Sequence, residues 1–227
     1  PPPTDVDYAP VHRAYHFDKS VYDNRLYYGF GKADPGVELV MGPNITDWPK
    51  MYDLTENLLV ELAAVIHDDV TTTDELIPSG ETSSYRSNPL GLAEFALSRK
   101  DPQYVGRAKE IQKAEKERMN GGHPCQAVPV LKDVMGEVKK QYPDASRENT
   151  GFGSTIFAVK PGDGSAREQA ASCQKVLGGW ANIANEYATK RYRSNLINWG
   201  MLPFLIQPGD LPFKNLDYLF IPGIKKA

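Results

Sequence analysis

The stretch from residue 154 to 179 limits the possible folds more than any other part of the sequence. Residues 154–160, STIFAVK, are a short β-rich run, and Pro-Gly-Asp-Gly at 161–164 predicts a turn. A helix is expected from Ser165 to Leu177, because two glycines follow directly and end it. A strand, a tight turn and a helix in succession are typical of α/β proteins, in which helices cover a sheet.

The other predicted elements favour the same class. Residues 54–70 give mixed signals, because their leucines and alanines favour a helix whereas the alternation of apolar residues favours a strand. The polar, hydroxyl-rich stretch 70–88 predicts a long loop. Alternating strands and helices indicate an α/β layer architecture with few, short strands and flanking helices. Helices are expected over 102–119, 128–141 and 188–198 and a strand over 181–183, and the tail has short apolar runs at 202–206 and 218–221.

The chain of 227 residues has room for one globular domain and an additional arm. We expect residues 1–53 to form an extended Tyr- and Pro-rich arm or interdomain linker, and residues 54–227 to form the domain. The tyrosines between residues 8 and 28 follow no helical or strand period, and their density favours packing against a neighbouring body. The three prolines at the start are neither an initiator nor a signal peptide, which indicates a piece of a longer polypeptide.

Composition excludes several classes of function. With 26 Lys and Arg against 29 Asp and Glu, the net charge of −3 argues against nucleic acid as a partner. No run approaches the roughly 18 apolar residues that a membrane span requires. The two cysteines, Cys125 and Cys173, form no C-x-x-C pair, so the sequence predicts no metal site of its own. Few cysteines and no leader indicate a cytoplasmic protein.

The densest chemical signal is PGDGSAREQA at residues 161–170, where a glycine turn places a serine and an arginine at a helix start. One interpretation is a capping box, in which Ser165 caps the helix and Glu168 reaches back to the backbone. The other is an anion site, because free N–H groups and the helix dipole favour negative charge there and Arg167 adds a guanidinium fork. Neither the P-loop nor the dinucleotide-binding glycine pattern fits the stretch.

A second, weaker signal is the run of threonines at 71–73 followed by Asp74 and, twelve positions later, Arg86. Taken alone, these residues are typical of a turn cap and a surface charge. Taken together and in this order, the two signals resemble the C-terminal swivelling domain of the aconitase family over about residues 55–221. The matching stretches are Thr72-Thr73-Asp74 with Gly80 and Arg86, Gly164-Ser165-Ala166-Arg167-Glu168 with Ala170, Leu177-Gly178-Gly179, and Asn195-Leu196 with Gly200, Leu202 and Pro203.

The resemblance implies a swivelling β/β/α domain of aconitase type and assigns roles to particular residues. Ser165 aligns with the catalytic serine, which as an alkoxide removes a proton next to a substrate carboxylate. Arg86 and Arg167 align with arginines that bind substrate carboxylates, and Thr73 and Asp74 with a loop that faces the active site. A serine is a weak base in water, so a helix N-terminus and nearby cations are needed to stabilise its anion.

The same resemblance implies an iron–sulfur hydro-lyase that isomerises or dehydrates a hydroxy-polycarboxylate such as citrate or isocitrate. Its [4Fe–4S] cluster would be bound by cluster-bearing N-terminal domains of the same polypeptide, which are absent from this chain. The isolated chain is therefore expected to fold without catalysing, because it lacks the Lewis acid for the leaving hydroxyl.

Several positions depart from the family pattern and leave two alternatives open. Ala166 and Gln169 replace a serine and a histidine, and Glu75 replaces the histidine common after TTD in aconitases. The run DELIP at 74–78 is closer to the small subunits of isopropylmalate or homocitrate-type isomerases, the first alternative. A catalytically inactive, aconitase-like binding module is the second.

Overall fold

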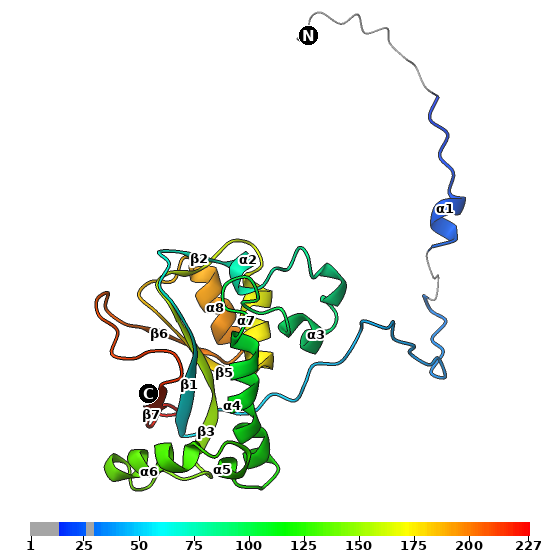
Figure 1. Cartoon of the computed structure of the whole chain (residues 1–227). Coiled ribbons are helices and arrows are strands. Elements are labelled where there is room, and N and C mark those ends of the chain that lie inside the picture. Colours follow the sequence, from blue (N-terminus) through cyan, green and yellow to red (C-terminus); the bar gives the residue numbers. More distant parts are fainter. Residues whose placement is uncertain (1–13, 26–29) are drawn as a thin grey trace, which may run out of the picture. The chain divides into compact units, whose positions relative to one another are not determined.

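The computed structural model describes residues 14–25 and 30–227 and divides the chain into two units, Pro1–Val40 and Met41–Ala227. The described part of the first unit holds one short helix, α1 (Ser20–Asp23) (Figure 1). The large apolar side chains in this part of the unit are exposed. The tyrosines at 8, 27 and 28 lie outside the described residues. The assignment of residues 1–53 as an arm stays a prediction.

The second unit is built on a five-stranded sheet with the strand order β6-β5-β3-β1-β7 (Figure 1). Neighbouring strands are parallel except for β7, which is antiparallel to β1. A parallel strand in the middle of a sheet is covered on both faces, so its sequence is a continuous apolar run. This burial explains why the mixed signals of residues 54–70 resolve into a strand. The strands are β1 (Asn57–Ile66), β3 (Thr150–Ala158), β5 (Gly179–Ala184), β6 (Leu202–Leu205) and β7 (Tyr218–Ile221).

The helices confirm most of the predicted pattern and the α/β class. The stretch 70–88, expected as a loop, contains two short helices, because Thr72 supplies a side-chain cap for the first of them. Residues 161–163 form a short strand, β4, beyond the predicted turn. The described part of the chain has no helix with the length and apolar character to cross a membrane. The helices of this unit are α2 (Thr73–Leu76), η2 (Ser83–Tyr85), α3 (Pro89–Ala93), α4 (Tyr104–Met119), α5 (Pro124–Ala127), α6 (Leu131–Gln141), α7 (Arg167–Val176) and α8 (Lys190–Asn198).

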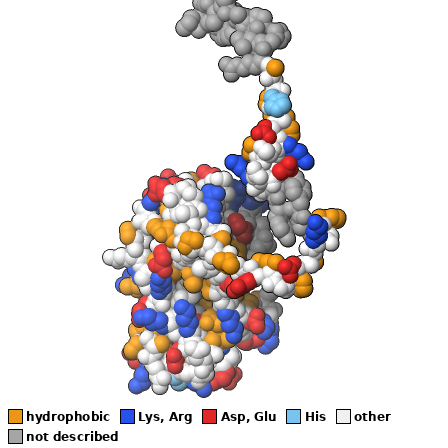
Figure 2. Space-filling view, turned by 90° about the vertical axis from the view of Figure 1, so that its right-hand side faces the viewer, with side chains coloured by type: hydrophobic (Ala, Val, Ile, Leu, Met, Phe, Trp, Pro, Cys, Tyr) orange, Lys and Arg blue, Asp and Glu red, His pale blue; other side chains and the backbone are white. Residues whose placement is uncertain are grey.

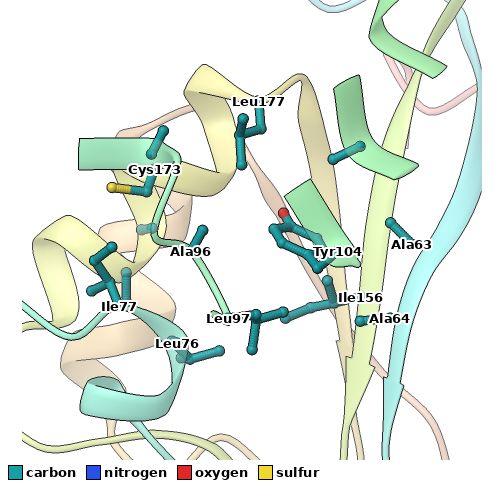
Figure 3. Packing of buried hydrophobic residues seen from close by; sticks show 14 of the residues in the cluster. Ala63, Ala64, Leu76, Ile77, Ala96, Leu97, Tyr104, Ile156, Cys173 and Leu177 are labelled. Atoms are coloured by element: carbon teal, nitrogen blue, oxygen red, sulfur yellow. The ribbon is translucent and has the colours of Figure 1, made fainter. Parts of the chain in front are cut away.

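The main core lies between the sheet and the helices α4 and α7 (Figure 3). Tyr104 of α4 and Leu177 at the end of α7 pack there with Ile156 of β3, and all three are almost fully buried. Complete burial of an aliphatic side chain such as Ile156 or Leu177 contributes about 1.5–3 kcal/mol to the free energy of unfolding. On the opposite face, Leu62 and Phe157 are covered by apolar residues between 204 and 219. This packing fixes the ends of the strands from which the candidate site is built.

Candidate functional site

A small second sheet brings the two sequence signals together. Strand β2 (Thr71–Thr72) pairs in parallel with β4 (Pro161–Asp163), with Thr71 opposite Pro161 and Thr72 opposite Asp163. Helix α2 begins directly after β2, and the turn that leads into α7 follows β4 directly. The TTD stretch and the GSAR stretch, far apart in the sequence, are therefore neighbours in space.

The contact between the two stretches is made by Thr73 and Gly164. Thr73 is buried, and its Oγ1 accepts a hydrogen bond from the backbone N–H of Ala166 at 3.3 Å. Gly164 has a φ of +135°, and a Cβ at this position would lie 2.1 Å from Thr73 Oγ1. Only glycine combines this backbone conformation with so close an approach. Thr73 thus holds the turn that carries Ser165.

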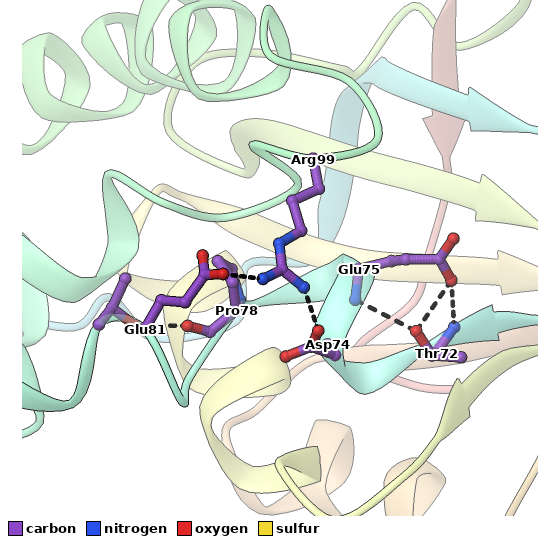
Figure 4. A network of polar contacts seen from close by, with 7 residues as sticks. Thr72, Asp74, Glu75, Pro78, Glu81 and Arg99 are labelled. Atoms are coloured by element: carbon purple, nitrogen blue, oxygen red, sulfur yellow. Dashed lines mark hydrogen bonds and ion pairs between the residues drawn. The ribbon is translucent and has the colours of Figure 1, made fainter.

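The capping box of this region lies at α2, where Thr72 is the N-cap (Figure 4). Its Oγ1 accepts from the N–H of Glu75 at 3.2 Å, and Glu75 Oε2 accepts from the N–H of Thr72 at 2.7 Å. Partial burial raises the pKa of Glu75, but the hydrogen bonds from Thr72 and Lys100 outweigh this effect and hold the pKa below its usual value. Glu75, a departure from the family pattern, therefore has a structural role.

Thr72→Ala is expected to lower the free energy of unfolding by about 1 kcal/mol, because α2 loses its cap and Glu75 loses a partner. Since the pKa of Glu75 is lower in the folded state, its stabilisation is complete above the unfolded-state pKa and is lost as the pH falls through the folded-state pKa. The difference from wild type should therefore narrow in acid. Urea unfolding at neutral and acidic pH measures it; Thr72→Ser, which keeps the hydroxyl, is the control and should lose far less.

Of the two interpretations of Ser165, the structure contradicts the capping box. The N-cap of α7 is Ala166, and no side chain caps the helix. Glu168 instead accepts hydrogen bonds from Asn195 Nδ2 of α8 and, at 2.5 Å, from Trp199 Nε1. Because α8 and the residue directly after it offer these donors, the carboxylate turns away from the backbone of its own helix. The hydroxyl of Ser165 is therefore not committed to capping, and its side chain is exposed.

Asp74 and Arg86, which are predicted to face a substrate, lie in different surroundings. Asp74 forms an ion pair with Arg99, whose guanidinium also binds Glu81 (Figure 4). Arg86 follows η2 and is exposed. The structure thus places Asp74 next to Thr73, in the loop that meets the GSAR turn, whereas Arg86 lies in the following loop.

Ser165 and Arg167 line a shallow hollow of about 410 Å³ at the starts of α7 and α8. Lys190 and Arg191, the first two residues of α8, line it as well, and sequence reasoning missed them. A topological signal existed: in a parallel sheet, helices that follow neighbouring strands begin at the same edge, and α7 and α8 follow β3 and β5. The hollow excludes Arg86 and is lined by Ser165, Arg167, Glu168, Lys190, Arg191, Ser194 and Asn195.

The charge of this hollow suits an anion. Arg167, Lys190 and Arg191 are cationic, while the only carboxylate among the lining residues, Glu168, is held by Asn195 and Trp199. Guanidinium groups bind carboxylates through two parallel hydrogen bonds. An exposed serine hydroxyl beside such cations and near the start of a helix meets the electrostatic needs of an alkoxide.

The thiols of the chain do not provide a ligand set for an iron–sulfur cluster. The sequence has two cysteines, and burial raises the pKa of Cys173 to about 12 and also raises that of Cys125. Metals bind the thiolate, which is disfavoured at both positions. Within residues 14–25 and 30–227, no three His, Cys, Asp or Glu side chains lie together as a metal site.

Comparison with known proteins shows similarity to one family model and to solved structures. Residues 108–209 match the family model of the aconitase C-terminal domain, a span that includes Ser165 and Arg167. Among solved structures, the chain is similar to a 3-isopropylmalate dehydratase from Methanocaldococcus jannaschii, with 21% identity over 75% of this chain and 73% of that one and a TM-score of 0.44. No match was found among curated proteins.

Proposed function

We propose that this chain, whose residues 108–209 match the aconitase C-terminal domain, supplies the base and the carboxylate-binding residues of an iron–sulfur hydro-lyase. Its substrate would be a hydroxy-polycarboxylate such as citrate or isocitrate, which the enzyme isomerises or dehydrates. One observation supports this proposal above all: Ser165 and Arg167 share a cationic hollow with Lys190 and Arg191.

In the proposed reaction, Ser165 removes a proton from the carbon next to a substrate carboxylate. The negative charge that develops on that carboxylate is stabilised by the guanidinium of Arg167, a donor fork that matches two carboxylate oxygens. The same cations and the start of α7 favour the serine alkoxide over the hydroxyl. When water adds back, the proton held by Ser165 returns to carbon.

We assign supporting roles to the remaining predicted residues. Thr73 positions Ser165, because its hydroxyl binds the N–H of Ala166 directly after that serine. Asp74 belongs to the loop that faces the substrate, and its pairing with Arg99 fixes that loop. Arg86 binds a second carboxylate from the loop after η2, and its exposure leaves the guanidinium accessible to substrate.

The cluster and the partner follow from the same assignment. We propose that a [4Fe–4S] cluster is bound by N-terminal domains of the same polypeptide, since this chain's cysteines do not form its ligand set. Such a cluster supplies the Lewis acid that holds the leaving hydroxyl. A cytoplasmic location suits both the reduced thiols and the cluster. An isopropylmalate isomerase remains the alternative enzyme, favoured by DELIP at residues 74–78.

The experiment is an anaerobic turnover assay on citrate, isocitrate and isopropylmalate. The complete enzyme that contains this chain, reconstituted with iron and sulfide, is expected to convert one of these acids. The isolated chain should show native circular dichroism and no turnover, because it lacks the cluster. Turnover by the isolated chain would contradict the division of roles. A complete enzyme with an intact cluster and no activity on these acids would favour the binding module.

A further inference from the structure

A second cavity, of about 240 Å³, shares no lining residue with the hollow around Ser165. Its apolar wall comes from Met51 and Tyr52 before β1, from Leu90 of α3, and from Val176 and Trp180 at the end of α7 and in β5. In other proteins a cavity of roughly 150 Å³ with such walls is large enough for benzene. The cavity therefore has room for a small ligand with an apolar body.

Lys175 of α7 also lines this cavity and is unusual for a lysine. It is only 8% exposed, its Nζ lies 3.8 Å from the centre of the Trp180 ring, and it donates a hydrogen bond to the Gly200 carbonyl at 3.3 Å. Within the described residues, it forms no ion pair. Burial lowers the pKa of Lys175 to about 8. Lysine is rarely buried without an anionic partner, because desolvation of its charge is costly.

The one carboxylate that lines the cavity, Glu115, favours the charged form of Lys175 but is bound to a different cation and forms no ion pair with Lys175. Glu115 accepts two hydrogen bonds from the guanidinium of Arg118, at 2.7 and 2.9 Å, and one from the N–H of Phe152 at 2.9 Å. Two exposed lysines, Lys50 and Lys116, also line the cavity. The lining thus has an excess of positive charge, and its one buried cation without a carboxylate partner is Lys175.

We propose that this cavity binds a small apolar monocarboxylate, whose carboxylate pairs with Lys175 and whose apolar part packs against Trp180 and Met51. The match is one of chemistry: an anion supplies the partner that the buried ammonium lacks, and the walls exclude water from an apolar body. A polycarboxylate fits less well, because Lys175 is the one buried ammonium group of the lining, whereas its other lysines, Lys50 and Lys116, are exposed. The site is therefore distinct in ligand class from the hollow around Ser165.

Benzoate and its neutral analogue benzamide are the probes, titrated into the whole 227-residue chain with detection by tryptophan fluorescence and ligand-observed NMR. Benzoate is expected to bind with a Kd of about 1 mM or lower, and benzamide about tenfold more weakly. This comparison requires no variant and so does not depend on the folding of a mutant.

Lys175→Met keeps the length and apolar character of the stem and is expected to weaken benzoate binding about tenfold, whereas Lys175→Arg keeps the charge and most of the affinity. The matched control is Lys116→Met, the same change at an exposed lysine of the same cavity, with an expected change of about twofold or less. The proposal is overturned if wild type shows no saturable benzoate binding up to about 20 mM. Equal binding of benzoate and benzamide, or unchanged binding by a folded Lys175→Met variant, would also overturn it.

Discussion

Ser165→Ala is expected to lower kcat of the complete, cluster-reconstituted enzyme by about three orders of magnitude or more, because the proposed reaction loses its base. KM should change little, since Arg167 and the cations of α8 still line the hollow. Loss of kcat without loss of binding is the signature of a group that acts in the transition state. Anaerobic steady-state kinetics on the acid that the wild type converts measure both constants.

Ser194→Ala is the matched control for this experiment. Ser194 lines the same hollow, but its Oγ donates a hydrogen bond to the Lys190 carbonyl one turn earlier in α8. Removal of this hydroxyl should change kcat by about twofold or less, because it serves its own helix. If both variants lost activity equally, the hollow would bind substrate without Ser165 as base. If Ser165→Ala kept wild-type kcat with an intact cluster, the assignment of the base would be wrong.

The sequence predicts local elements well where turn residues and periodicity agree. The glycine turn before α7 and the two glycines after it mark that helix to within two residues of its observed start and one of its end. Residues 54–70 cannot be assigned in this way. Strand β1 lies between the parallel strand β3 and the antiparallel strand β7, and almost all of its residues are buried. Periodicity cannot separate a fully buried strand from a buried helix.

The capping boxes show why sequence patterns alone do not settle a site. The pattern S/T-x-x-E occurs at Thr72–Glu75 and again at Ser165–Glu168. Only the first pair forms the reciprocal hydrogen bonds of a capping box. The difference lies in two donors, Asn195 of α8 and Trp199 directly after it, which bind Glu168 and lie far along the sequence from it. The cations Lys190 and Arg191 likewise escape a local sequence pattern, because their position follows from the order of the strands in the sheet rather than from a motif.

The site also depends on a close contact that no motif states. Gly164→Ala is expected to lower the free energy of unfolding by about 3 kcal/mol and to lower turnover, because it strains the turn that carries Ser165. The φ of +135° disfavours any side chain there, and the new Cβ would meet Thr73 Oγ1 at 2.1 Å. Urea unfolding and kinetics on the same variant measure the two effects. Gly80→Ala is the control, because its Cβ meets nothing within 4 Å and its stability should stay close to wild type.

A double-mutant cycle separates the clash from the backbone strain. Thr73→Ala removes Oγ1 and leaves Thr73 Cβ as the nearest atom of that residue, 3.3 Å from the Cβ of an alanine at 164. The double variant should therefore recover the part of the loss that arises from the clash, with an interaction energy of about 1 kcal/mol or more, and keep the part that arises from φ. If the losses in stability of the two single variants were strictly additive, Thr73 and residue 164 would not be in contact in solution. Thr73 would then have no role in positioning Ser165.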